Sequence, residues 1–136
     1  MPSSTTSSEP ARVLIVDDNE QMLERTSSIL SSDFTVVGIA KDGPGAIEAV
    51  ATLRPDVIVL DISMPGMTGL EVAAHLRKIG SKAKVVFLTV HEEDEVVLAA
   101  IAAGAAGYVV KPRLGSDLSL AVREARAGRT FVSRIR

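Results

Sequence analysis

The stretch DVIVLDISMPGMTG, residues 56–69, decides the fold of this chain. It begins with an uninterrupted apolar run from Val57 to Leu60, which is short and rich in β-branched residues. That pattern is typical of a strand buried on both faces. The run ends at Asp61, after which a proline and two glycines interrupt regular structure. The stretch therefore predicts a carboxylate held by a rigid strand at the mouth of a loop, although such an acid can also be an ordinary polar strand end.

The rest of the chain alternates between strand-like and helix-like segments. Helices are predicted to begin near Asn19, Gly43, Thr68, Glu92 and Ser116, each after an apolar run. Strict alternation predicts an α/β fold, a doubly wound five-stranded parallel sheet in the order 2-1-3-4-5 flanked by five helices. The five strands are predicted at residues 13–16, 34–40, 57–60, 84–89 and 108–110.

Composition places the chain among ordinary globular domains. The chain has 136 residues, a formal net charge of −2 and no cysteine, which excludes disulfides, thiol catalysis and thiolate metal sites. The charge gives no reason to expect nucleic-acid binding, and no apolar run is long enough to span a bilayer. We expect a cytoplasmic protein with a disordered tail over residues 1–10, one domain over 11–128 and the start of a linker over 129–136.

Chemically distinctive side chains follow several of the predicted strands. Asp17 and Asp18 end the first, Asp61 the third, Thr89 the fourth and Lys111 the fifth. Each alone has an ordinary role as a cap or a solvated charge, but parallel strands bring all of them to one edge of the sheet. Carboxylates without His or Cys suit Mg²⁺ or Mn²⁺, and a lysine suits phosphate. An aspartate beside a divalent cation and a lysine can act as a nucleophile on phosphorus.

These residues lie within four motifs that carry a resemblance to a known family. The chain resembles the flavodoxin-like receiver domain of bacterial two-component response regulators over about residues 12–130. The motifs are VDD at 16–18, LDISMPGMTGLE at 60–71, LT at 88–89 and YVVKP at 108–112. Each motif is weak alone, but together in this order and spacing they are specific.

The resemblance implies a role for each residue at the predicted edge. Asp61 is the phosphoacceptor, which takes a phosphoryl group from the phosphohistidine of a sensor histidine kinase or from acetyl phosphate. Asp18 and Asp61 bind the metal directly, Asp17 binds it through water, and the backbone carbonyl of Ser63 supplies a further ligand. Lys111 pairs with carboxylate or phosphoryl oxygens. The domain assists its own phosphorylation and dephosphorylation without being an enzyme in the ordinary sense.

The resemblance also implies a switch. Thr89 moves to the phosphoryl group and Tyr108 swings inward behind it, which changes the face built from the fourth helix, the fifth strand and the fifth helix. The Lys111–Pro112 peptide bond is often cis in the family. Ser63 and His91 occupy positions that modulate the access of hydrolytic water, although an exposed histidine more often has no such role.

The C-terminal residues 114–136 resemble the last helix and linker of NarL/FixJ-type regulators, in which a helix-turn-helix DNA-binding domain follows the receiver. We therefore expect a receiver that controls transcription through a DNA-binding domain absent from this chain, without direct DNA or membrane binding of its own. A single-domain regulator that acts by protein–protein contact is the alternative. A homodimer formed on phosphorylation is a further expected partner.

Three other functions remain open at the level of sequence. A metal-dependent phosphatase usually has a second acid just after its nucleophile, where this chain has Ile62 and Ser63. A pseudo-receiver would lack an acid, Thr89 or Lys111, and none is lacking. A flavodoxin-like cofactor binder would carry a phosphate-binding loop, rather than two acids, after its first strand.

Overall fold

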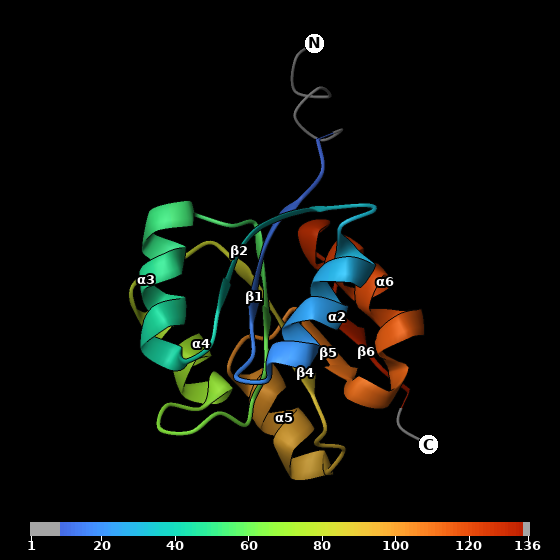
Figure 1. Cartoon of the computed structure of the whole chain (residues 1–136). Helices are drawn as coiled ribbons and strands as arrows, with labels where there is room; N and C mark the ends of the chain where they lie inside the picture. Colours follow the sequence, from blue (N-terminus) through green and yellow to red (C-terminus); the bar gives the residue numbers. More distant parts are fainter. Residues whose placement is uncertain (1–8, 135–136) are drawn as a thin grey trace.

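A computed structural model describes residues 9–134, so most of the tail expected over residues 1–10 lies outside the described part. Strands and helices alternate along the chain (Figure 1). The strands are β1 (Arg12–Val16), β2 (Thr35–Ala40), β3 (Val57–Leu60), β4 (Lys84–Thr89), β5 (Gly107–Val110) and β6 (Phe131–Val132). The helices are α2 (Glu20–Leu30), α3 (Gly43–Leu53), α4 (Gly69–Lys78), α5 (Asp94–Ala102), the 3₁₀ turn η1 (Lys111–Arg113) and α6 (Leu114–Arg126).

All strand pairs are parallel, and the sheet has the order β2-β1-β3-β4-β5-β6. Alternate side chains of β3 enter two separate cores, because neighbouring residues of a strand point to opposite faces. Ile58 and Leu60 pack with α3, α4 and α5, whereas Val57 and Val59 pack with α2 and α6. Figure 1 shows α3 and α4 on one side of the sheet and α2 and α6 on the other. The predicted doubly wound fold, and a β3 buried on both faces, are confirmed.

The sheet has one strand more than the sequence predicted. Phe131 and Val132, in the segment expected to begin a linker, pair with Gly107 and Tyr108 of β5. Two residues are too few to show the alternation by which a strand is recognised in a sequence. The last helix begins at Leu114 rather than at Ser116, because η1 leads directly into it.

The expectation of a cis Lys111–Pro112 bond is wrong for this structure, since no peptide bond in residues 9–134 is cis. Pro112 lies in the first turn of η1, whose helical backbone is built from trans peptides. Trans is also the ordinary state of a peptide bond before proline.

Local signals placed the starts of α2, α3 and α4 well. Asn19 caps α2 by accepting from the Met22 amide at 2.9 Å, and Thr68 and Glu71 form a capping box at the predicted start of α4. The cap of α3 is Asp42, one residue before the predicted start. Within residues 9–134, no helix has both the length and the apolar character that a membrane span requires.

Candidate functional site

The acidic residues meet at the carboxyl ends of two neighbouring strands. Val16 of β1 pairs with Leu60 of β3, so Asp17 and Asp61 emerge side by side. One carboxylate oxygen from each of Asp17, Asp18 and Asp61 lies within 4.8 Å of the others. Asp17 and Asp61 are buried, whereas Asp18 is exposed. The predicted convergence of these three acids is therefore present.

Lys111 reaches this cluster from the end of β5. Its Nζ lies 3.2 Å from Asp17 Oδ2 and 3.6 Å from Asp61 Oδ2. One ammonium thus lies against two buried carboxylates, and Asp18 adds a third acid beside them. The local charge is net negative, which favours the binding of a further cation.

The donor atoms of the cluster fit a hard divalent cation. All three side chains offer carboxylate oxygens, the ligand type that Mg²⁺ prefers. Asp17 Oδ1 accepts from the Asn19 amide at 2.9 Å, but the buried Oδ2 of Asp17 has no hydrogen-bond partner, only the ion pair with Lys111. A buried oxygen without a hydrogen bond is costly, and a metal ion or its bound water would satisfy it.

The electrostatics of Asp61 follow from its burial. Desolvation and the nearby charge of Asp17 raise the pKa of Asp61 from 3.8 to about 6, although Lys111 and the Ser63 amide act in the opposite direction. At neutral pH the Asp61 carboxyl group is therefore ionised, although its burial and the charge of Asp17 both disfavour the ionised form. A divalent cation beside it would lower its pKa again.

The two predicted switch residues both bond to the backbone of His91. Thr89 is buried, and its Oγ1 accepts from the His91 amide at 3.2 Å. Tyr108 is fully buried, and its hydroxyl donates to the His91 carbonyl at 2.8 Å. Tyr108 thus already points inward in this structure, beside Phe87 with ring centroids 6.5 Å apart. Burial, followed by the charges of Glu93 and Glu92, raises the pKa of Tyr108 to about 12, so the hydroxyl remains a donor.

A serine–histidine–glutamate chain crosses the mouth of the site. Ser63 Oγ lies 2.5 Å from His91 Nε2, and His91 Nδ1 lies 3.4 Å from Glu93 Oε1. The Ser63 amide in turn donates to Asp61 Oδ1 at 3.3 Å. The sequence pointed to Ser63 and His91 but not to Glu93, which is the neighbour of Glu92, where a helix was predicted to begin. The metal-binding role of the Ser63 carbonyl stays a prediction.

The loop after Asp61 closes tightly on itself at Gly69. The Gly69 amide donates to the Ile62 carbonyl at 2.8 Å. A Cβ at this position would lie 2.1 Å from the Asp61 carbonyl oxygen, so no larger residue fits without moving the backbone. Glycine is thus required here by close approach of two backbone segments, which a sequence pattern does not reveal.

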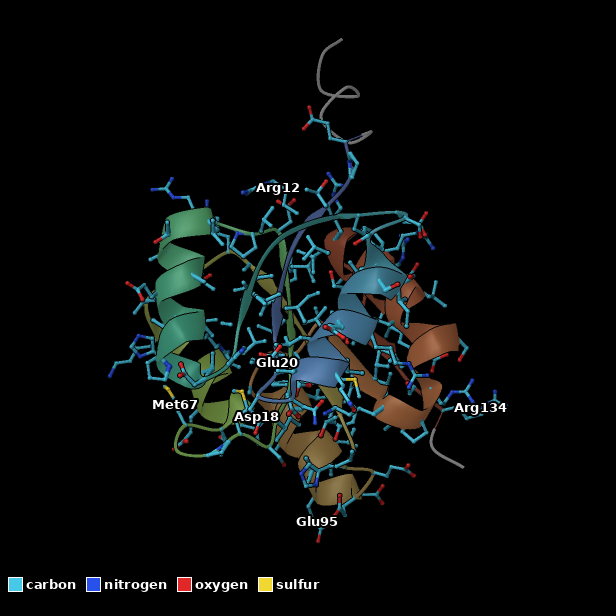
Figure 2. All side chains as sticks on the ribbon, in the orientation of Figure 1. Arg12, Asp18, Glu20, Met67, Glu95 and Arg134 are labelled. Carbon is cyan, nitrogen blue, oxygen red and sulfur yellow. The ribbon has the colours of Figure 1, made fainter. Side chains whose placement is uncertain are left out.

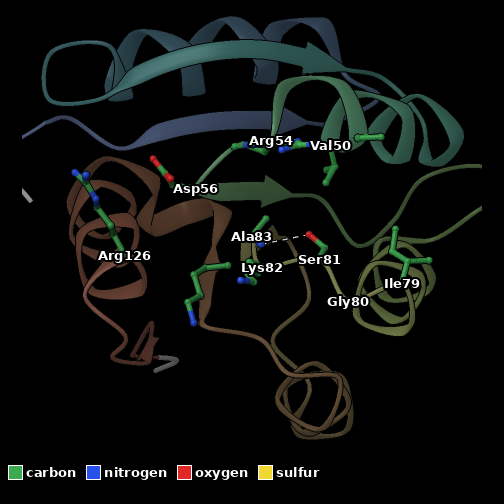
Figure 3. Close-up of a pocket in the computed structure, with 12 residues that line it drawn as sticks. Val50, Arg54, Asp56, Ile79, Gly80, Ser81, Lys82, Ala83 and Arg126 are labelled. Atoms are coloured by element: carbon green, nitrogen blue, oxygen red, sulfur yellow. Dashed lines mark hydrogen bonds between the residues drawn. The ribbon is translucent and has the colours of Figure 1, made fainter. Parts of the chain in front are cut away.

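The site lies at one end of the molecule, and a separate pocket lies at the other. Figure 2 shows Asp18 at the lower end of the sheet, with Met67 of the β3–α4 loop at the same end of the molecule. A pocket of about 880 Å³ lies at the opposite, amino end of β3 and β4, and Figure 3 shows Arg54, Asp56 and Arg126 among its lining residues. Arg54 is the C-cap residue that follows α3 and Arg126 is the last residue of α6, and helix carbonyls favour positive charge at both places, so the fold itself explains these cations.

Comparison with known proteins agrees with this geometry. The family model described as the response regulator receiver domain matches residues 13–123. The chain belongs to this family. Membership favours the receiver interpretation over the phosphatase and the cofactor binder, and it makes this chain a signalling domain of two-component systems.

This receiver domain is similar to proteins of the NarL type. It is 38% identical over 127 residues to the nitrate/nitrite response regulator NarL of Escherichia coli K12, covering 92% of this chain and 59% of NarL. The solved signal receiver domain of NarL from Mycobacterium tuberculosis superimposes with a TM-score of 0.85 at 36% identity, covering 89% of this chain and 99% of that one. The chain thus spans less than two thirds of full-length NarL.

Receivers with this likeness also occur within enzymes. The chain is 41% identical over 128 residues to protein-glutamate methylesterase/protein-glutamine glutaminase 5 of Myxococcus xanthus, covering 85% of this chain and 37% of that protein. Similarity in the receiver part therefore does not identify the activity of a whole protein.

Proposed function

We propose that this receiver domain accepts a phosphoryl group on Asp61 from the phosphohistidine of a sensor histidine kinase, and that Asp17, Asp18, Asp61 and the Ser63 carbonyl hold Mg²⁺ (or Mn²⁺) for the reaction. The observation that carries the proposal is the cluster of three carboxylates within 4.8 Å beside the Lys111 ammonium. The carboxylate oxygens of the cluster are hard donors, and the buried Asp17 Oδ2 has no hydrogen-bond partner; both features fit a divalent cation.

The residues divide the chemistry between them. A carboxylate oxygen of Asp61 attacks phosphorus, and the bond from phosphorus to the donor nitrogen breaks as the histidine leaves. The bound cation, when present, neutralises the negative charge that gathers between the carboxylates and the phosphoryl oxygens. Lys111, already 3.6 Å from Asp61 Oδ2, is placed to pair with one of those oxygens.

We propose that His91 transmits this event to the surface. Thr89 and Tyr108 each bond to its backbone, so a movement of Thr89 toward the phosphoryl group would displace the same segment that holds Tyr108. The affected surface is the face formed by α5, β5 and α6. Phosphorylation would thus bias a two-state element by local contacts.

The output we propose is transcription, through a helix-turn-helix DNA-binding domain outside this chain. The similarity to NarL and the partial coverage of its length support this proposal. The alternative, a regulator that acts by protein–protein contact alone, predicts a phosphorylation-dependent partner without DNA. A cytoplasmic location and a homodimer formed on phosphorylation belong to the same proposal.

The proposal is tested by intact-mass spectrometry after incubation with acetyl phosphate. Wild-type protein is expected to gain one phosphoryl group only when Mg²⁺ is present, and Asp61→Asn none, because the amide is not a nucleophile. Asp33→Asn, an exposed acid paired with Arg123, is the matched control and should behave as wild type. An adduct on Asp61→Asn would exclude Asp61 as the acceptor. A wild type that binds no Mg²⁺ and takes no phosphoryl group from donor or kinase would be a pseudo-receiver.

The phosphoryl lifetime should depend on His91. Its ring contacts Ser63 across the mouth of the site, so His91→Ala is expected to admit water more freely and to hydrolyse the phosphoryl group about fivefold faster, the equivalent of one hydrogen bond of about 1 kcal/mol. Decay of the phosphorylated mass measures the rate. His75→Ala changes an exposed histidine on α4 and should leave the rate unaltered. An equal effect of both substitutions would contradict a local role for His91.

A further inference from the structure

Ser133, which follows β6, is buried at 3% exposure and forms three hydrogen bonds. Its amide donates to the Tyr108 carbonyl at 2.8 Å. Its Oγ accepts from the Val110 amide at 3.3 Å and donates to Asp117 Oδ2 at 2.7 Å. The hydroxyl therefore links the last residue of β5 to the first turn of α6.

Asp117 gathers three such donors. Besides Ser133, it accepts from Arg113 Nε at 2.9 Å and from Ser116 Oγ at 2.9 Å. Burial acts to raise the pKa of Asp117, but the hydrogen bonds from Ser133, Arg113 and Ser116 outweigh it, and the pKa lies below its ordinary value. The carboxylate is ionised at neutral pH and strengthens all three bonds.

These bonds hold the chain on both sides of Lys111. Val110 precedes Lys111 and is tied to Asp117 through Ser133, and Arg113 follows two residues later and is tied to Asp117 directly. Lysine has a flexible side chain and keeps a fixed position only if its backbone is held. The Lys111 ammonium lies 3.2 Å from Asp17 and 3.6 Å from Asp61, distances that a small backbone shift would lose.

We propose that Asp117 and Ser133 are positioning residues that hold Lys111 against Asp17 and Asp61. The inference rests on the proposed function only in that it gives Lys111 a part in phosphoryl transfer. A purely structural role, in which the bonds merely anchor β6, predicts a different result. The Lys111 ammonium opposes a second cation at the same carboxylates, so releasing it should tighten Mg²⁺ binding, whereas loosening the fold should weaken it.

The test compares Ser133→Ala and Asp117→Asn with wild type by NMR on the full chain. Without metal, the side-chain signals of Lys111 are expected to move in both variants toward those of the exposed Lys78. In a Mg²⁺ titration both variants should bind on the order of threefold to tenfold more tightly, in the same direction as Lys111→Ala. Glu124, which like Asp117 belongs to α6, forms an ion pair with Arg129. Glu124→Gln makes the same acid-to-amide change there and should alter neither the Lys111 signals nor the Mg²⁺ affinity.

Each outcome decides the inference. Unchanged Lys111 signals, or Mg²⁺ binding that is unchanged or weaker in folded variants, would overturn it. If Asp117→Asn does not fold, Ser133→Ala decides alone, because it keeps the backbone bond to Tyr108. If wild type binds no Mg²⁺, the proposed function fails, and the metal-free Lys111 signals still test the positioning.

Discussion

In the absence of divalent cations, Asp61→Asn is expected to be more stable than wild type by about 3 kcal/mol at pH 7, because it removes a buried charge. The pKa of Asp61 is raised from 3.8 to about 6, chiefly by burial and then by Asp17. The folded protein therefore binds this proton more tightly than the unfolded chain does. The stability contributed by protonation is complete below about pH 4 and is lost as the pH rises through about 6. Asparagine stays neutral throughout.

Urea unfolding of both proteins at two pH values measures this effect. The difference in unfolding free energy should shrink to about 1 kcal/mol at pH 4.5, where much of the wild-type carboxyl is protonated. Mg²⁺ should stabilise wild type at pH 7 and leave Asp61→Asn nearly unaffected, since the variant has lost a ligand. A difference that is independent of pH, or a variant less stable than wild type at pH 7, would contradict the assigned electrostatics.

Gly69→Ala is expected to destabilise the protein by about 3 kcal/mol or more, the upper range for a residue forced into a packed interior. The added Cβ would lie 2.1 Å from the Asp61 carbonyl oxygen, and a backbone atom cannot yield as a flexible side chain can. Relief requires a shift of the loop that carries Asp61 and Ser63, so Mg²⁺ binding should weaken as well. Thermal or urea unfolding and a Mg²⁺ titration measure the two effects.

Gly115→Ala is the matched control for this prediction. Gly115 also lies near the start of a helix, α6, but nothing lies within 4 Å of a Cβ built on it. Alanine there should be neutral or stabilise by about 0.5–1 kcal/mol, because it restricts the unfolded chain and favours the helix. Equal losses at both glycines would refute the close-approach explanation for Gly69.

Several features could be predicted from the sequence because they depend on neighbours in the chain. The apolar run before Asp61 indicated a strand buried on both faces, and Thr68 indicated a helix start. Both are present. The meeting of Asp17, Asp61 and Lys111 also followed from sequence, since alternating units impose parallel strands whose carboxyl ends share one edge. Local sequence patterns and the parallel topology are sufficient to predict such features.

Other features were decided only by the tertiary structure, because they depend on residues far apart in sequence meeting at atomic distance. Ser63 and His91 come from different loops, and Ser133 reaches Asp117 only because β6 pairs with β5. Close approach of two backbone segments makes glycine necessary at position 69. By itself, the sequence determined the fold and which groups gather at the sheet edge. The packing of distant segments decided how those groups are oriented, buried and held.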